Sequence, residues 1–166
     1  MATQSQIRSK EQLLSGWIEV RQQIIQEVIP ITDQDRDRPF LGIWSIKDML
    51  AHLAGWDYAN LEGVRAILVG MPPPFYSYHD RDWKKYNAML VAKYKRDSFP
   101  ELIELLKESQ QALTEFLDTV PAEAFNRDFG VRFRGYKVTI KRLLEAETRD
   151  EQIHYQQIKD YFKESK

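Results

Sequence analysis

Apolar residues recur at helical spacing along four long stretches of the chain. Prolines or glycines break the pattern after the first three stretches, at Pro30, at residues 70–74 and at Pro121. Four periodic segments between such breaks are typical of a helical bundle, and we expect an all-α four-helix bundle with antiparallel main helices. The spacing places the long helices over residues 9–29, 45–69, 98–120 and 139–162.

The connecting segments carry weaker signals. Ser45 followed by Asp48 resembles a capping box and marks the start of the second long helix. Residues 32–39 are charged and predict a loop, whereas residues 82–95 predict an extra short helix. Residues 125–138 are rich in aromatic residues and glycine, and predict an ordered loop or weak hairpin before the last helix. Because no linker or repeat divides the chain, we expect one domain over residues 1–166.

The apolar stripe of the last helix is interrupted by polar residues. At about 100° per residue, one side of this helix holds apolar residues near both ends. Burying carboxylates is costly unless they are paired, hydrogen-bonded or bound to a metal, so this polar turn requires a partner. The flanking apolar residues are Ile140, Leu143, Leu144, Ile158, Tyr161 and Phe162, and the polar residues between them are Glu147, Asp150, Glu151 and His154.

Two explanations of this polar turn stay open. The turn could lie at the edge of the bundle, paired with Arg142, Arg149 or Lys141. Alternatively it could form a polar pocket or metal site inside the bundle, because Asp150 and His154 lie one turn apart on one face.

A histidine on the second long helix is the natural partner for such a site. His52 lies at the flank of the apolar stripe, beside Met49 and Trp56. A lone histidine there is usually structural, but two of the three histidines in this chain lie on or beside inward faces of long helices. The third, His79, is expected at the surface. Imidazole and carboxylate ligands suit zinc, nickel, manganese or iron.

Composition narrows the possible functions. The 24 basic and 25 acidic residues are mixed along the chain, and the net charge of −1 argues against nucleic-acid binding. The absence of cysteine excludes disulfides, thiolate metal ligands and a cysteine nucleophile. With no secretory signal and no apolar run of membrane-spanning length, we expect a cytoplasmic protein without a membrane partner. The 12% aromatic content leads us to expect a homodimer.

Two stretches resemble the DinB-like superfamily of four-helix-bundle proteins. Residues 44–64, WSIKDMLAHLAGWDYANLEGV, resemble its second-helix signature, in which a histidine follows a Trp-Ser/Thr start and an acidic residue. Residues 150–158, DEQIHYQQI, resemble its H-x-x-x-H-x-x-Q-I ending, although Asp150 stands where the first histidine is usual. The resemblance implies a divalent metal, zinc or nickel, held by His52, Asp150 and His154. Two histidines and a carboxylate form a familiar ligand set for divalent metals.

A second resemblance concerns the segment before the third long helix. Residues 72–90, PPPFYSYHDRDWKKYNAML, resemble the DfsB/ClbS branch of the superfamily, in which some members lack the metal ligands. It implies that Trp83 and Asn87 line the mouth of a pocket. The plainer alternative is core packing for Trp83 and a surface amide for Asn87.

Three functional hypotheses follow, and the resemblances imply the first two. The first is a metal-dependent thiol S-transferase that joins a low-molecular-weight thiol to a small electrophile, with Glu147 or Glu151 as the candidate catalytic residue. The second is a metal-free hydrolase or small-molecule-binding protein whose pocket includes Trp56, Tyr58, Trp83 and Asn87. The third is a structural dimeric bundle whose polar layer specifies pairing.

Overall fold

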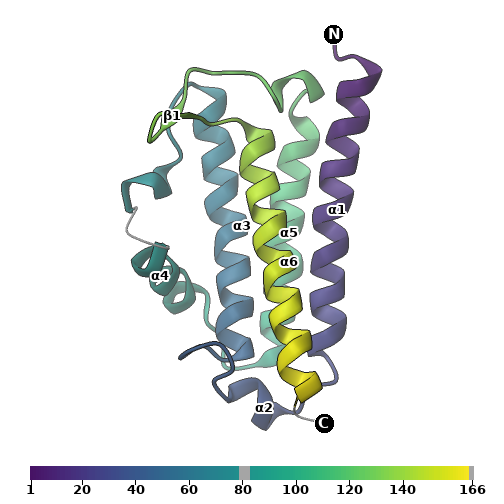
Figure 1. The fold of residues 1–166 in the computed structure, drawn as a ribbon, viewed down its shortest axis with the longest axis vertical. Helices are drawn as coiled ribbons and strands as arrows, with labels where there is room; N and C mark the ends of the chain where they lie inside the picture. The colour runs from purple at the N-terminus through teal and green to yellow at the C-terminus, as the bar shows by residue number, and fades with distance from the viewer. Residues whose placement is uncertain (79–82, 165–166) are drawn as a thin grey trace.

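The computed structural model describes residues 1–78 and 83–164, and it is a four-helix bundle (Figure 1). The predicted all-α bundle, its extra short helix and its ordered segment before the last helix are confirmed. His79 and the first residue of the predicted segment 82–95 lie outside the described residues. The long helices are α1 (Gln4–Val28), α3 (Ile46–Leu68), α5 (Phe99–Thr119) and α6 (Ile140–Glu164). The shorter elements are α2 (Asp33–Asp37), η1 (Pro74–Tyr78), α4 (Lys84–Tyr94), η3 (Ala122–Ala124), β1 (Arg132–Phe133) and β2 (Tyr136–Lys137).

Polar side chains fix where several of the helices begin. The predicted capping box of α3 is present, since Ser45 Oγ accepts from the Asp48 amide at 3.2 Å and Asp48 Oδ2 accepts from the Ser45 amide at 3.0 Å. The loop predicted over 32–39 is wrong because Thr32 accepts from the Asp35 amide and caps α2, whose first turn is acidic and suits the helix dipole.

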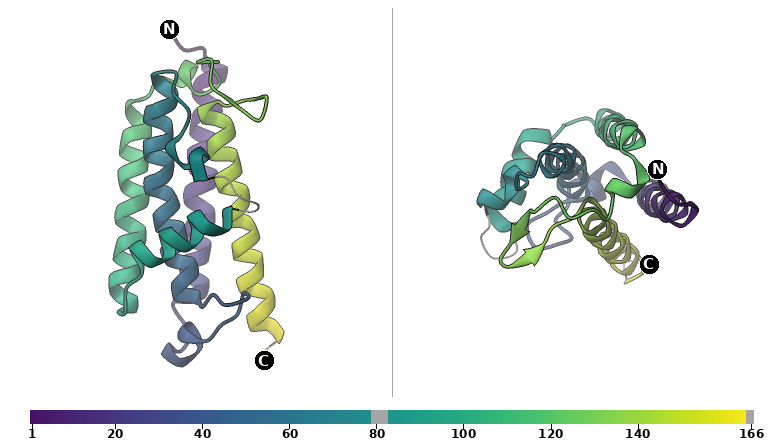
Figure 2. Two further views of the ribbon diagram at one scale, coloured as in Figure 1. Left: turned by 90° about the vertical axis from the view of Figure 1, so that its left-hand side faces the viewer. Right: turned by 90° about the horizontal axis from the view of Figure 1, so that it is seen from above.

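The direction of the helices departs from the antiparallel expectation. α3 and α5 run the same way, while α1 and α6 both run the opposite way (Figures 1 and 2). The chain therefore returns along the bundle between α3 and α5, through η1 and α4, before α5 starts beside the start of α3. Apolar contacts agree with this pairing, because Leu50 clusters with Leu102 near the helix starts and Ile67 clusters with Leu117 near their ends.

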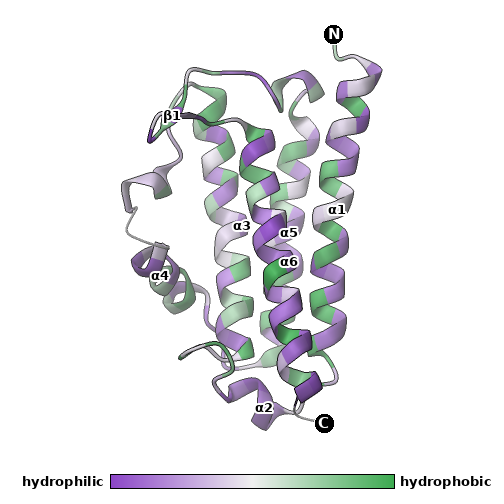
Figure 3. Ribbon diagram, viewed as in Figure 1, coloured by the Kyte–Doolittle hydropathy of each residue, from purple (hydrophilic) through white to green (hydrophobic). Residues whose placement is uncertain are grey.

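The apolar core is divided into two clusters. One includes Trp17, Ile67 and Leu144, and the other includes Ile24, Leu50 and Leu106. Between them lies a buried polar layer of side chains from all four long helices, which are Arg21, His52, Asp57, Asn60, Ser109, Glu147, Glu151 and His154. Along its length α6 shows more hydrophilic colour than α3 (Figure 3).

A glycine lets α4 lie close against α3. A Cβ atom at Gly55 would lie 2.8 Å from Leu90 Cβ and 3.0 Å from a ring carbon of Tyr94, so any larger residue would push α4 away. Leu90 is the one buried residue of α4. Among the described residues, no helix combines the length and the apolar character needed to cross a membrane.

Candidate metal centre

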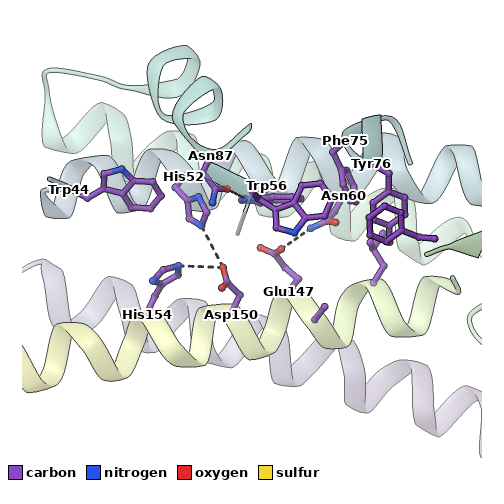
Figure 4. A pocket seen from close by; sticks show the side chains of 14 residues that line it. Trp44, His52, Trp56, Asn60, Phe75, Tyr76, Asn87, Glu147, Asp150 and His154 are labelled. Atoms are coloured by element: carbon purple, nitrogen blue, oxygen red, sulfur yellow. Dashed lines mark hydrogen bonds and ion pairs between the residues drawn. The ribbon is translucent and has the colours of Figure 1, made fainter. Parts of the chain in front are cut away.

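His52 on α3 faces Asp150 and His154 on α6 across the bundle (Figure 4). Asp150 Oδ2 lies 3.5 Å from His52 Nε2 and 3.3 Å from His154 Nε2. Both imidazoles are buried, whereas the Asp150 side chain is 46% exposed. Each residue offers one ligand atom within 4.8 Å of the others. The structure thus brings together the three residues singled out in the sequence.

The donor atoms suit a divalent cation. Ligands about 2.0–2.2 Å from a tetrahedral zinc ion lie roughly 3.3–3.6 Å from one another, close to the two separations observed. His154 Nδ1 lies 2.8 Å from Gln157 Oε1, and this bond is satisfied when Nδ1 carries the proton and Nε2 keeps its lone pair for a metal. His52 Nδ1 is buried and has no hydrogen-bond partner within the described parts of the chain.

The charge states of Asp150 and His52 suit cation binding, whereas His154 would have to give up a proton to bind a metal. Burial raises the pKa of Asp150, but the two histidines outweigh burial and hold that pKa well below its ordinary value. Burial lowers the pKa of His52, which favours the neutral imidazole. Burial also lowers the pKa of His154, but the hydrogen bond and charge of Asp150 outweigh it, so the net pKa is raised. A negative carboxylate and a neutral imidazole are the forms that coordinate a metal.

Deeper in the bundle, an arginine from α1 holds two carboxylates. Arg21 donates to both oxygens of Asp57 at 2.9 and 3.0 Å, and from Nε to Glu151 Oε2 at 2.9 Å. Arg21 Nη2 also contacts Glu151 Oε1, which accepts from Trp17 Nε1 at 3.0 Å. Ser109 Oγ donates to Asp57 Oδ2 at 2.6 Å. Burial lowers the pKa of Arg21, but its two carboxylate partners outweigh burial and raise the pKa well above its ordinary value.

This arrangement decides against the first of the two open explanations, in which the polar turn lies at the bundle edge and pairs with Arg142, Arg149 or Lys141. Arg142 donates to a backbone carbonyl and Lys141 pairs with Glu145, so neither compensates the polar turn of α6. Arg21 was missed, although it follows Trp17 by one helical turn on the apolar face of α1, which is a signal of the same kind as in α6. Asp57 interrupts the buried face of α3 in the same way.

Glu147 differs from Glu151 in its partners. Glu147 Oε2 accepts from Asn60 Nδ2 at 2.8 Å, whereas Oε1 is buried without a hydrogen-bond partner in the described residues. Burial first, and then the charges of Glu151, Asp57 and Asp150, raise the pKa of Glu147 well above its ordinary value. Glu147 also lines a cavity next to His52, Asp150 and His154, whereas Glu151 does not.

The volume of this cavity is about 460 Å³, and His52, Asp150 and His154, here called the triad, form part of its wall. Of the four predicted pocket residues, Trp56, Trp83 and Asn87 line it. Asn87 is not merely a surface amide, because its Oδ1 accepts from Trp56 Nε1 at 2.8 Å. Tyr58 does not line the cavity: it follows Trp56 by two residues, about 200° around the helix, and stacks on Tyr94. The aromatic lining residues are Trp44, Trp56, Phe75, Tyr76, Trp83 and Phe133.

Comparison with known proteins settles the family. Residues 17–158 match the DinB superfamily. The chain belongs to this superfamily. The family resemblance seen in the sequence is therefore confirmed, while the DfsB/ClbS branch stays a prediction. No curated protein matches the chain.

Solved structures share the fold at low sequence identity. A Streptococcus pneumoniae protein is 15% identical, with a TM-score of 0.77 over 93% of this chain and 90% of that one. An uncharacterised Escherichia coli protein is 16% identical, with a TM-score of 0.72 over 94% of each chain. Bacillus subtilis YfiT, described as a probable metal-dependent hydrolase with an unusual four-helix bundle topology, is 20% identical, with a TM-score of 0.70 over 99% of this chain and 90% of that one.

Proposed function

We propose that this DinB-superfamily protein is a metal-dependent enzyme that acts on a small electrophilic molecule in the cavity beside His52, Asp150 and His154. The observation that carries the proposal is the position of this triad in the wall of a cavity. Structural metal sites are closed by four protein ligands, whereas catalytic sites have three and leave a position open. The side chains of the triad match zinc or nickel, which are the metals we propose.

The triad and its neighbours have separate tasks. A divalent cation held there would supply Lewis-acid chemistry, lowering the pKa of a coordinated water or thiol. The two imidazoles supply neutral nitrogen ligands, Asp150 supplies the negative charge, and Gln157 orients His154. Glu147 is the candidate that moves a proton, because it lines the cavity and one of its oxygens has no partner in the described parts of the chain.

The nucleophile that we propose is a low-molecular-weight thiol, which makes the protein a thiol S-transferase. The chain has no cysteine, so the sulfur must come from a second substrate. Hydrolysis with water as the nucleophile is the second candidate. It is favoured by the fold shared with YfiT, which is described as a probable metal-dependent hydrolase.

Metal analysis tests the proposal and separates it from the metal-free alternative. Untagged protein would be dialysed against zinc or nickel and its metal content measured by mass spectrometry. We expect stoichiometric metal in the wild type and in the control Asp160→Ala, since Asp160 is exposed on the same helix, and none in His52→Ala. A wild type that retains no metal contradicts the proposal.

Activity assays then separate the two reactions. The zinc-loaded protein would be incubated with glutathione and 1-chloro-2,4-dinitrobenzene, and separately with 4-nitrophenyl acetate without thiol. Metal-dependent loss of thiol supports the transferase, and metal-dependent ester cleavage without thiol supports the hydrolase.

A further inference from the structure

Three carboxylates of the polar layer lie close together, and a single guanidinium binds two of them. Asp57, Glu147 and Glu151 each place a carboxylate oxygen within 4.8 Å of the others, and all three are buried. The donors of Arg21 go to Asp57 and Glu151, and none of its hydrogen bonds reaches Glu147. Glu147 therefore receives an amide hydrogen bond from Asn60 but no cationic partner among the described residues.

Glu147 lines the cavity with a side chain that has one unpartnered oxygen among the described residues. Glu147 is 6% exposed, and no residue that the structure describes forms a hydrogen bond with its Oε1 atom. Figure 4 shows its carboxylate directed toward Asn60 and Trp56 on α3. A buried oxygen without a donor is unfavourable, and a ligand that supplies a donor would remove that cost. Burial and the neighbouring carboxylates raise the pKa of Glu147, and an ammonium group beside it would oppose that shift and favour the ionised carboxylate.

The walls around this oxygen favour an organic cation over a second metal ion. Trp56 forms a cluster with two other rings, with centroid separations of 5.1 Å to Phe75 and 6.2 Å to Trp83. Aromatic faces attract ammonium groups, and neither lysine nor arginine lines the cavity among the described residues. A hard metal ion would need several oxygen ligands, but Arg21 already occupies both Asp57 and Glu151.

We propose that the cavity binds a small organic ammonium compound, with its charged nitrogen on Glu147 Oε1 and its apolar or aromatic body against Trp56, Phe75 and Trp83. This inference rests on the proposed function only in that the same molecule would be the substrate of the neighbouring metal centre. The substrate class is thus a compact amine with its reactive group within reach of His52, Asp150 and His154.

Paired probes test the charge preference without metal. EDTA-treated protein would be titrated with benzylamine and with benzyl alcohol, which are similar in size, while heat or tryptophan fluorescence is measured. We expect benzylamine to bind at least about tenfold more tightly, the ratio expected for one charge-assisted hydrogen bond. Glu147→Gln keeps the shape and the acceptor for Asn60, so it should bind benzyl alcohol as before but lose the preference. Glu145→Gln, which alters a partly exposed carboxylate on the same helix, should behave like the wild type.

Each alternative result has a definite meaning. Equal binding of the two probes by the wild type, or a preference that survives in Glu147→Gln, overturns the inference. A preference that arises only after zinc is added shows that the amine ligates the metal, and this also overturns the inference. Failure of the proposed function is seen independently, as a lack of metal in the wild type.

Discussion

Two groups of polar side chains include residues of α6 that lie within two helical turns of each other. One group surrounds Arg21 and the other surrounds Asp150, and they differ in how their charges are balanced. Around Arg21, every oxygen of Asp57 and Glu151 accepts a hydrogen bond, and all three side chains are at most 1% exposed. Around Asp150, in contrast, one imidazole nitrogen has no partner in the described residues and the carboxylate is half-exposed beside a cavity.

The contrast distinguishes a group whose charges the protein itself balances from the group that we propose to be functional. Burying an ion pair is costly, and the Arg21 group compensates that cost within the protein. The His52–Asp150–His154 group, in contrast, lines a cavity, and one of its imidazole nitrogens has no partner among the described residues. Glu147 lies between the two groups and shares a property of each, because it is buried like the first and incompletely paired like the second.

The largest loss of stability is expected when the buried carboxylates Asp57 and Glu151 lose Arg21. Arg21→Met would leave Asp57 and Glu151 buried without their cation, and we expect the free energy of unfolding to fall by about 3–5 kcal/mol. Urea denaturation measures this change. As a control, Arg65→Met removes a half-exposed arginine paired with Glu62, and we expect a change below about 1 kcal/mol. Similar losses in both variants would contradict the structural role of Arg21.

Substitutions of the adjacent residues Asp150 and Glu151 should affect different properties, metal binding for the first and stability for the second. Glu151→Gln is expected to lower the free energy of unfolding by about 3 kcal/mol, because it weakens the buried pair with Arg21. Asp150→Asn should change stability little but weaken metal binding by at least about tenfold, since even changes outside the ligand shell cost that much. Urea denaturation and zinc titration of both variants measure the two quantities. A fall in both quantities for both variants would mean that the two groups act as one.

Because Glu147 is buried and incompletely paired, we expect it to make the stability of the fold depend on pH. Its pKa is raised in the folded protein, so the folded state binds this proton more tightly than the unfolded chain does. The resulting stabilisation is present below the ordinary pKa of 4.5 and is lost as the pH rises through the folded pKa. Glu147→Gln is always neutral, so at neutral pH we expect it to be more stable than the wild type, with a flatter dependence on pH. Urea midpoints from acidic to mildly alkaline pH test this, and a steeper dependence in the variant would refute it.

The smallest effect is expected in the cavity wall. Asn87→Ala removes the acceptor of Trp56 Nε1, a half-buried hydrogen bond between α4 and α3, and we expect a loss of about 1 kcal/mol. Asn126→Ala, at an exposed position, should change stability by no more than about 0.5 kcal/mol. Thermal unfolding of both variants would show the difference. Equal midpoints would mean that the bond from Trp56 adds nothing to stability.

Helical periodicity was sufficient to predict the four long helices. The meeting of His52 with Asp150 and His154 was predicted from periodicity together with the resemblance to the DinB-like superfamily. Their direction was not predictable, because an amphipathic stripe looks the same whether its neighbour runs parallel or antiparallel to it. Arg21 was missed for a related reason: a lone arginine among apolar residues resembles a side chain that reaches out to solvent. The prediction that Tyr58 lines the pocket was wrong because two residues along a helix lie about 200° apart, so Tyr58 and Trp56 point to different sides of α3.

The parallel pairing of α3 and α5 has a consequence for how this fold can diversify. It requires a connecting segment along the outside of the bundle, and that segment supplies Phe75, Trp83 and Asn87 to the cavity. α4 buries only Leu90 and rests on α3 at Gly55. The connection could therefore be lengthened, shortened or exchanged while the buried ion pairs and the triad stay in place. In protein engineering, grafting a different connection between α3 and α5 is a direct way to change which molecule reaches the triad.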